Sequence, residues 1–528
     1  MLLFAYPPYD LEFLVLIALV PLFHFIFSQN SLKKIFWGGV IAGFIYMAGL
    51  FTWLLKTFPF DWLGVEPGPE SAPMIVLLIV LWLIQIVFLS LFFGLFTWIF
   101  KKIFTRQKNI LSFLVIAPCL WILFEYLRAW GFGILWLGKE TLFGPHWTFG
   151  NLAYSLHNLT PLIQVADIFG IYGISLLIVL INSILFLIFR YFIKTKKIFI
   201  GKQFIIPFAV LVSVLVFWIG YGILKLDQKE TGKPRKVAIL QTKFFSGSNF
   251  NPYQTKEVLT VILDLFQRTQ SIQEKPDFVV VPEGFGIVAF TKNTEIAKYL
   301  LKDFWQPGQI FLENEKIIDE NNKIKSRLFY YDLDEKEPIE YHDKRLLVPN
   351  GDFLSYVANF LIKIYSAKNS FENKWYTKGE SEDIARTPKG NVGGTICSSI
   401  VSPETDRKMT KNGAQFLAVV SSDAPFHEAK SLLMQNLAMS KLRATENRRY
   451  FVQATNMGYS FAINHQGKIL VKSSRIGNDI LFSQIELLDK KTLYTKFGDW
   501  IILLSFLILI ARLSFPQLRS SIDNENFV

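Results

Sequence analysis

Seven long apolar runs constrain the fold of this chain more than any other feature. They lie at about 11–28, 35–55, 74–100, 110–126, 161–189, 203–224 and 498–514. Runs of this kind suit helices that cross a bilayer, because about 20 apolar residues span its hydrocarbon core. Hydrophobic residues make up 51% of the 528 and charged residues only 19%, which is typical of a membrane protein with a soluble part. We predict a transmembrane bundle of about six spans over 1–224, a soluble domain over 225–497, a last span at 498–514 and a tail at 515–528.

The basic residues predict how these spans are oriented. They gather in every second loop, at Lys33 and Lys34, at 101–108 and at 190–202, while the loops between them are poorer in positive charge. By the positive-inside rule the basic loops are cytoplasmic, which puts 225–497 outside the cytoplasm and returns Arg519 to the inside. We therefore read the net charge of +12 as membrane topology and expect no nucleic-acid partner. The first run follows no basic residue and precedes no small-residue cleavage site, so we expect it to remain as a span.

Two parts of the predicted bundle are unusual. The loop 128–160 is rich in Trp, Gly and His, a composition that suits an interfacial layer. Glu125 and Asp167 fall near the ends of spans, where an ionisable side chain either lines a cavity or reaches interfacial water. The residues alone leave both readings open.

From Lys236 onward, short β-branched runs alternate with amphipathic helical patterns. Strands are expected at 237–241, 278–281, 310–312, 328–333, 416–421, 450–454, 460–464 and in the run that ends at Cys397. Helices are expected at 255–268, 292–304 and 429–447. Strands interleaved with helices over about 250 residues indicate an α/β layered domain.

Three expected strand ends carry residues with useful chemistry. Glu283 follows the strand 278–281, Lys344 precedes a hydrophobic strand and a turn at Asn350–Gly351, and Cys397 ends the run NVGGTIC. Taken singly, a cysteine is most often a small buried hydrophobe, and Glu and Lys are most often surface charges. Together they supply what acyl transfer through a thioester requires: a thiol, a carboxylate base, and a cation for the charge on the attacked carbonyl oxygen.

An ordered series of motifs carries a family resemblance over nearly the whole chain. The motifs are PYD at Pro8–Asp10, the run Ala117–Leu137, PEG at Pro282–Gly284, DKRLLVPNGDF at Asp343–Phe353, TIC at Thr395–Cys397, SSDAPF at Ser421–Phe426 and the run Ala454–Ile469. In these residues the chain resembles the nitrilase superfamily and, within it, the apolipoprotein N-acyltransferase family. The resemblance implies a transmembrane bundle joined to an α/β nitrilase-like domain with αββα layers, inserted before the last span.

The resemblance also implies a reaction and its site. Cys397 would take an acyl chain from a phospholipid as a thioester and pass it to the α-amine of a diacylglyceryl-cysteine apolipoprotein. Glu283 would be general base and acid, and Lys344 would support the oxyanion with the backbone N–H of Ser398. The partners expected are membrane lipid, a phospholipid donor and a diacylated apolipoprotein, with no metal or cofactor and no need for an oligomer, so a monomer is expected. The implied location is the bacterial inner membrane, with the domain on the periplasmic side.

The sequence departs from the family pattern near the expected site. Ser398 and Ser399 stand where the family has an aromatic residue and a Glu, and Asp352 replaces a Glu. The family has eight spans and seven are expected here. A membrane-tethered amidase or transacylase with another acceptor, and a non-catalytic lipoprotein-binding paralogue, stay open as alternatives. The amphipathic stretch Phe353–Ser366 suits an interfacial lid and equally an ordinary domain helix.

Overall fold

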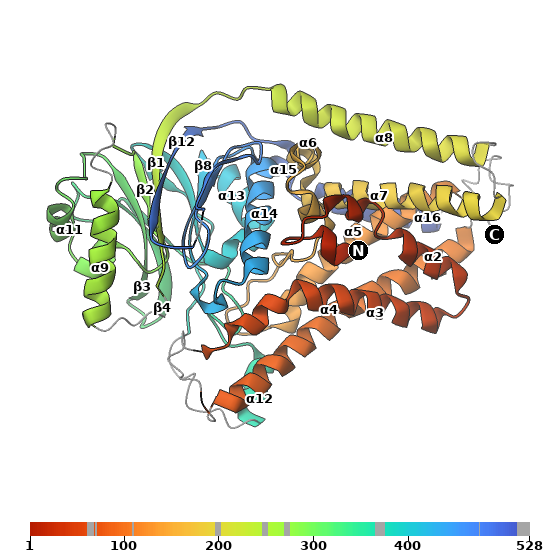
Figure 1. Ribbon diagram of the computed structural model, residues 1–528, viewed down its shortest axis with the longest axis horizontal. Helices are drawn as coiled ribbons and strands as arrows, with labels where there is room; N and C mark the ends of the chain where they lie inside the picture. Colours follow the sequence, from red (N-terminus) through yellow and green to blue (C-terminus); the bar gives the residue numbers. More distant parts are fainter. Residues whose placement is uncertain are drawn as a thin grey trace.

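A computed structural model describes residues 1–60, 68, 71–107, 110–195, 202–244, 252–268, 275–364, 375–474 and 476–514. Several sequence predictions fall outside these residues: the tail 515–528 with Arg519, parts of the basic loops near 108 and 196–201, and the last two residues of the stretch Phe353–Ser366. Two bodies make up the described chain, a helical bundle and a domain built on a β-sheet (Figure 1).

The bundle contains helices from both ends of the chain. Its elements are α1 (Leu2–Ala5), η1 (Glu12–Leu16), α2 (Val20–Ser28), α3 (Leu32–Leu50), η2 (Thr52–Thr57), α4 (Ala72–Gln107), α5 (Ile110–Leu135), η5 (Leu152–Leu156), α6 (Thr160–Ile163), α7 (Ala166–Thr195), α8 (Lys202–Asp227), α15 (Leu493–Phe497) and α16 (Trp500–Ser514). Five of the seven predicted spans match helices that are long and apolar enough to cross a membrane. The first and last, Glu12–Ser28 and Trp500–Ser514, are shorter apolar helices, so spanning at these two places stays a prediction.

The domain is built on one sheet whose strands run in the order β5-β4-β3-β2-β1-β9-β8-β7-β6, with β10, β11 and β12 paired off this path. The strands are β1 (Lys233–Thr242), β2 (Phe278–Val280), β3 (Ile310–Ile318), β4 (Ile324–Asp332), β5 (Glu340–Asp343), β6 (Ala385–Thr387), β7 (Gly390–Ile396), β8 (Phe416–Ser422), β9 (Phe451–Asn456), β10 (Phe461–Ile463), β11 (Ile469–Lys472) and β12 (Asp479–Leu487). The helices are α9 (Pro252–Gln267), α10 (Ile287–Thr291), α11 (Thr294–Leu300), α12 (Tyr356–Ile364), α13 (Pro403–Lys411) and α14 (Lys430–Asn447), with short turns η6 (Cys397–Val401) and η7 (Ala424–Phe426).

The sheet folds back on itself, so that its two halves form the middle layers of a sandwich. Between them lies an apolar core in which Phe278 of β2 meets Phe416 of β8, with ring centroids 4.9 Å apart. A second core packs β1–β4 against α9 and α11 on the outer face, and a third packs β7–β9 against α13 and α14. Figure 1 shows α13 and α14 between the sheet and the bundle. The expected αββα layering is confirmed, because each half-sheet buries both of its faces.

One prediction about a strand was wrong. The apolar residues that follow Lys344 do not form a strand; Leu346 and Leu347 are buried in an irregular segment. Lys344 instead comes directly after β5, and its backbone N–H donates to the Ser326 carbonyl at 2.7 Å. A short apolar run satisfies the pattern of a strand and of a buried loop equally well, which explains the error. The turn at Asn350–Gly351 is confirmed.

Helix α14 joins the domain to the bundle, and most of its residues are buried although many are polar. Arg443 pairs with Glu446 at 2.9 Å, both fully buried, and Glu446 also accepts the backbone N–H of Ile171 from α7 at 3.1 Å. Just past the helix, Arg448 pairs with Asp167 at 2.9 Å. Asp167 is therefore engaged by the domain and does not reach interfacial water. Glu125 is likewise buried and accepts the Leu152 N–H at 2.9 Å.

We expect Arg443→Ala to destabilise the protein strongly, by about 3 kcal/mol, because the substitution leaves the Glu446 charge buried without its partner. The apparent unfolding temperature in detergent, followed by Trp fluorescence, measures the effect. Arg268→Ala is the matched control, since the pair that Arg268 makes with Asp264 is about half exposed and is worth at most about 1 kcal/mol. Equal unfolding temperatures in the two variants would contradict a stabilising role for the buried Arg443–Glu446 pair.

Candidate active site

The predicted site residues meet because four strands end at the same edge of the sheet. β1, β2, β3, β7, β8 and β9 run parallel, and β5 regains their direction after the antiparallel β4. Glu283, Lys344 and Cys397 follow β2, β5 and β7, and Asp423 follows β8. The carboxyl ends of parallel strands are where open α/β sheets bind ligands. The structure thus brings the three predicted catalytic residues into one cavity, together with a fourth ionisable side chain.

Cys397 sits at a sharp corner between β7 and η6. Its backbone has φ +50°, in the left-handed region that non-glycine residues rarely adopt, and such strain is found mostly at functional sites. β7 can pack this closely on the facing strand β4 because it carries Gly394. A Cβ at position 394 would lie 2.0 Å from the Tyr330 hydroxyl of β4. The Cys397 sulfur faces the cavity and lies 4.0 Å from the Ser422 carbonyl.

The two serines after Cys397 have structural contacts of their own. Ser398 donates its hydroxyl to the Leu346 carbonyl at 2.8 Å, which ties η6 to the segment that follows Lys344. Ser399 is buried and donates to the Ile396 carbonyl at 3.2 Å. A buried Glu at position 399 would need a hydrogen-bond or charge partner there. The Ser399 hydroxyl needs none beyond the carbonyl of its own turn. The oxyanion role expected for the Ser398 N–H stays a prediction.

Lys344 is the cation of the site. Its side chain is buried, and its ammonium lies 2.7 Å from the Asp352 carboxylate, whose same oxygen accepts the Val348 N–H at 2.8 Å. Burial alone would lower the pKa of Lys344, but the charges of Asp352 and Glu283 outweigh burial and hold the pKa above its ordinary value. The ammonium is therefore permanently charged, and Asp352 keeps it pointed at the cavity.

The Cys397 thiol and the Glu283 carboxyl influence each other's pKa. Both face the cavity, and burial is the main cause that raises the pKa of each. The Glu283 charge raises the pKa of the Cys397 thiol further, while Lys344 opposes both shifts. Cys397 is consequently a neutral thiol at rest. A thiol in that state needs a base within reach, and the Glu283 carboxyl, which lines the same cavity, is the candidate for that role.

The cavity, about 890 Å³, continues from these residues into the bundle. One end is polar and holds Glu283, Lys344, Cys397 and Asp423. The other end is an arm lined by apolar and aromatic side chains of η2, α4, α5 and the loop after α5: Phe51, Trp53, Leu54, Met74, Leu77, Leu78, Leu81, Trp82, Phe132, Trp136, Trp147 and Phe149. Spacings of three and four residues put Met74, Leu77 and Leu81 on one face of α4. Polar chemistry thus sits at the head of an apolar arm.

The Trp- and His-rich loop 128–160 supports the corner that bears Cys397. His146 Nδ1 hydrogen-bonds to the Ser402 hydroxyl at 2.9 Å, and the Thr148 hydroxyl donates to the Val401 carbonyl at 2.7 Å. These residues are buried. The loop, predicted as an interfacial layer, therefore packs beneath η6 and fixes the turn from the side of the bundle.

Helix α12 borders the same cavity. Ala358 and Ile362 line it, the Tyr356 N–H donates to the Leu137 carbonyl at 2.8 Å, and Tyr356, Phe360 and Ile364 are exposed apolar side chains. A helix with one face on a cavity and an apolar face outward fits the lid reading of Phe353–Ser366 better than the reading as an ordinary domain helix. Its movement as a lid stays a prediction.

Two buried carboxyl groups near the site were not singled out from the sequence. Asp423 lines the cavity and accepts the Thr455 hydroxyl at 3.2 Å; burial raises its pKa to about 7. Glu313, on β3, accepts the N–H groups of Ile287 and Val288 at 2.9 Å and so holds α10, the helix that follows Glu283. The motif SSDAPF at a strand end was the available signal for Asp423, whereas nothing in the sequence distinguishes Glu313.

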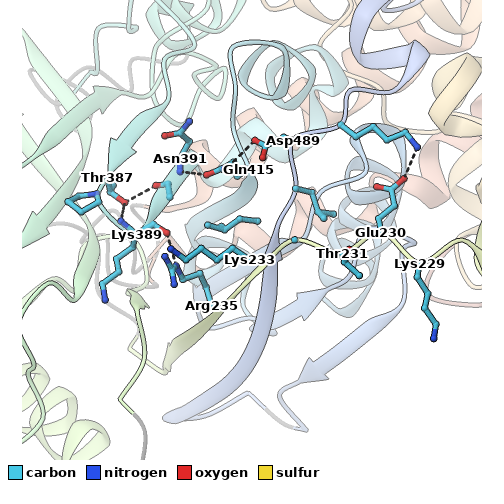
Figure 2. A pocket seen from close by; sticks show the side chains of 16 residues that line it. Lys229, Glu230, Thr231, Lys233, Arg235, Thr387, Lys389, Asn391, Gln415 and Asp489 are labelled. Carbon is cyan, nitrogen blue, oxygen red and sulfur yellow. Dashed lines mark hydrogen bonds and ion pairs between the residues drawn. The ribbon is translucent and has the colours of Figure 1, made fainter.

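A second hollow, about 780 Å³, lies where β1 begins and β12 ends, at the edge of the sheet opposite to Cys397 (Figure 2). Its charges are mostly satisfied: Arg235 donates to the Lys389 carbonyl at 2.7 Å, and Lys490 lies 3.7 Å from Glu230. It contains none of the predicted site residues. We therefore place the candidate site in the cavity around Cys397.

Removing the Lys344 charge should make Cys397 less reactive. In a Cys119→Ala background, which leaves one thiol, we expect Lys344→Met to slow alkylation by iodoacetamide about tenfold or more at pH 8, because the pKa of the thiol rises when the cation is lost. Intact-mass spectrometry over time gives the rate. Lys325→Met is the control, since Lys325 is a buried lysine that pairs with Asp343 at 3.6 Å, away from the cavity. An unchanged rate in Lys344→Met would contradict this electrostatic role.

Two family models cover most of the chain. The apolipoprotein N-acyltransferase N-terminal domain matches residues 1–184, and the carbon-nitrogen hydrolase family matches residues 236–490. Among solved structures, Nit3 of Saccharomyces cerevisiae, a nitrilase superfamily member, has 18% identity and a TM-score of 0.36, covering 56% of this chain and 98% of that one.

Similar curated proteins carry one name. The apolipoprotein N-acyltransferase of Geobacter metallireducens is 27% identical over 74% of this chain and 72% of its own length. That of a Nostoc species is 25% identical over 96% of this chain and 95% of its own. The similarity to these relatives thus extends over both the bundle and the sheet domain. The chain belongs to the apolipoprotein N-acyltransferase family of the carbon-nitrogen hydrolase superfamily.

Proposed function

We propose that this protein transfers an acyl chain from a phospholipid to the N-terminal α-amine of diacylglyceryl-cysteine apolipoproteins, through a thioester on Cys397. One observation carries the proposal: Glu283, Lys344 and Cys397 meet at the polar head of a cavity whose apolar arm lies among the helices of the bundle. An acyl chain in that arm would bring its ester carbonyl to the thiol. Family membership supports the same reaction, since the curated relatives are named for it.

In the first half-reaction, Glu283 takes the proton of the Cys397 thiol as sulfur attacks the ester carbonyl carbon. The negative charge that develops on the carbonyl oxygen is stabilised by the Lys344 ammonium, which Asp352 holds at 2.7 Å. Glu283 then gives its proton to the leaving oxygen of the lysophospholipid. The carboxyl thus returns to its charged form, and the acyl chain remains on sulfur.

In the second half-reaction, the neutral α-amine of the lipoprotein attacks the thioester carbonyl. Glu283 takes a proton from the attacking nitrogen and returns it to sulfur as the C–S bond breaks. The products are an amide and the free thiol. Lys344 stabilises the same oxygen in both halves, so one ammonium serves two transition states.

We place the site at the outer face of the bacterial inner membrane. The basic loops support a cytoplasmic position for the opposite ends of the helices. The cavity crosses from the sheet domain into the bundle, so a donor would reach Cys397 without leaving the bilayer. Ser398 and Ser399 keep the turn in place by hydrogen bonds, and we infer that activity does not need a charge at position 399.

Incubation of the purified protein with phospholipid should produce an acyl adduct on Cys397, detected by intact-mass spectrometry. The adduct should be absent in Cys397→Ala, and absent in Lys344→Ala although that variant still folds. Addition of a diacylated lipopeptide should discharge it. Discharge only to water or to other amines would favour a tethered amidase or transacylase, and no adduct at all would favour a non-catalytic binding protein; either result overturns the proposal.

The apolar arm should set the length of the acyl chain. Leu77→Trp fills part of the arm, so we expect transfer of chains of sixteen or more carbons to fall about tenfold or more while ten-carbon chains are retained. Leu83→Trp, on an exposed face of α4, is the matched control and should transfer both equally. Competition between the two donors, with the adducts separated by mass, measures the ratio. An equal loss for both chain lengths in Leu77→Trp would show that the donor does not use this arm.

A further inference from the structure

Acidic side chains outnumber basic side chains along the cavity. Four carboxyl groups line it, on Glu283, Glu315, Asp352 and Asp423, against three lysines, Lys292, Lys316 and Lys344. Lys292, at the cavity wall beyond α10, is already paired with Glu315. An anionic excess in an enclosed space favours a cationic ligand. The primary ammonium of a peptide N-terminus has that charge.

A count of protons, which rests on the proposed function, shows what such a ligand requires. An α-ammonium carries three protons and the amide product keeps one. Of the two that leave, one regenerates the Cys397 thiol by way of Glu283. The other must leave before the amine can attack, and Glu283 cannot hold both. The site therefore needs a second base.

The contacts of the remaining carboxyl groups identify this base. Asp352 is engaged by Lys344 at 2.7 Å and by the Val348 N–H at 2.8 Å, so taking a proton there would break the pair that holds the ammonium. Asp423 is buried, lines the cavity, and has no cation partner in the described chain. Its contacts are a hydroxyl of Thr455 at 3.2 Å and an amide of Asn436 at 3.5 Å.

We propose that Asp423 binds the α-ammonium of the acceptor and takes the first of its two protons. The N–H bond breaks, its electron pair stays on nitrogen as the lone pair that attacks the thioester, and the proton passes to solvent after the amide leaves. The ionisable groups that act on Asp423 across the cavity are Glu283 and Cys397. Burial, with the Glu283 charge, raises the pKa of Asp423 to about 7, close to that of an α-amine, so transfer in either direction is easy.

Asp423→Asn tests the inference on the full-length protein in two steps. The acyl-enzyme is first formed from phospholipid and taken to completion, so that the second step starts from the same amount of acyl-enzyme in both proteins. A diacylated lipopeptide is then added and the discharge rate is followed from pH 6 to pH 9. Without Asp423, only amine that is already neutral in solution can react. Discharge should fall at least about tenfold at pH 7, climb about tenfold per pH unit below the pKa of the amine, and recover at pH 9.

Asp406→Asn is the matched control, because Asp406 is a buried carboxyl of α13 whose pKa is also about 7 and which lies outside the cavity. It should keep the pH profile of the unchanged protein. An Asp423→Asn discharge rate that is unaltered, or lowered equally at every pH as a structural role would produce, overturns the inference. Failure of the unchanged protein to form an acyl-enzyme would instead overturn the proposed function.

Discussion

Burial of α14 on both of its sides is the constraint on which the rest of the structure depends. One side packs on β7–β9 and the other on the bundle, so its polar residues must find partners in a dry interface. The Arg443–Glu446 pair, the Ile171 N–H and the Arg448–Asp167 pair supply them. Since η6 packs on the same helix, this joint also fixes how Cys397 faces the membrane helices.

The site combines two environments that neither body has alone. The sheet domain contributes charged groups at its strand ends, held rigidly by hydrogen bonds to the backbone. The bundle contributes an apolar space, and its loop 128–160 supports the turn from below through Thr148 and His146. The low-polarity surroundings strengthen the electrostatic interactions of the Lys344 ammonium with charge that develops in the cavity.

The sequence predicts the parts of this arrangement that depend on local pattern. Apolar run length located the five long membrane helices, and alternation located most strands, because both signals are contained in a few neighbouring residues. Glu283 and Cys397 were found at strand ends for the same reason. The strand expected after Lys344 was wrong because Leu346 and Leu347 are buried by packing without strand pairing. Asp423 and Glu313 gain their meaning from the tertiary fold, which buries them beside the strand ends that carry Cys397 and Glu283.

The shape of the cavity also has a kinetic consequence. In the proposed reaction, the acyl chain that is transferred lies in the apolar arm, at the head of which Cys397 sits. Because that chain would stay in the arm as part of the thioester, the lysophospholipid must leave the polar end of the cavity before the amine of the acceptor can reach Cys397. The proposed reaction would then follow ping-pong kinetics, in which each substrate, in excess, inhibits the half-reaction of the other.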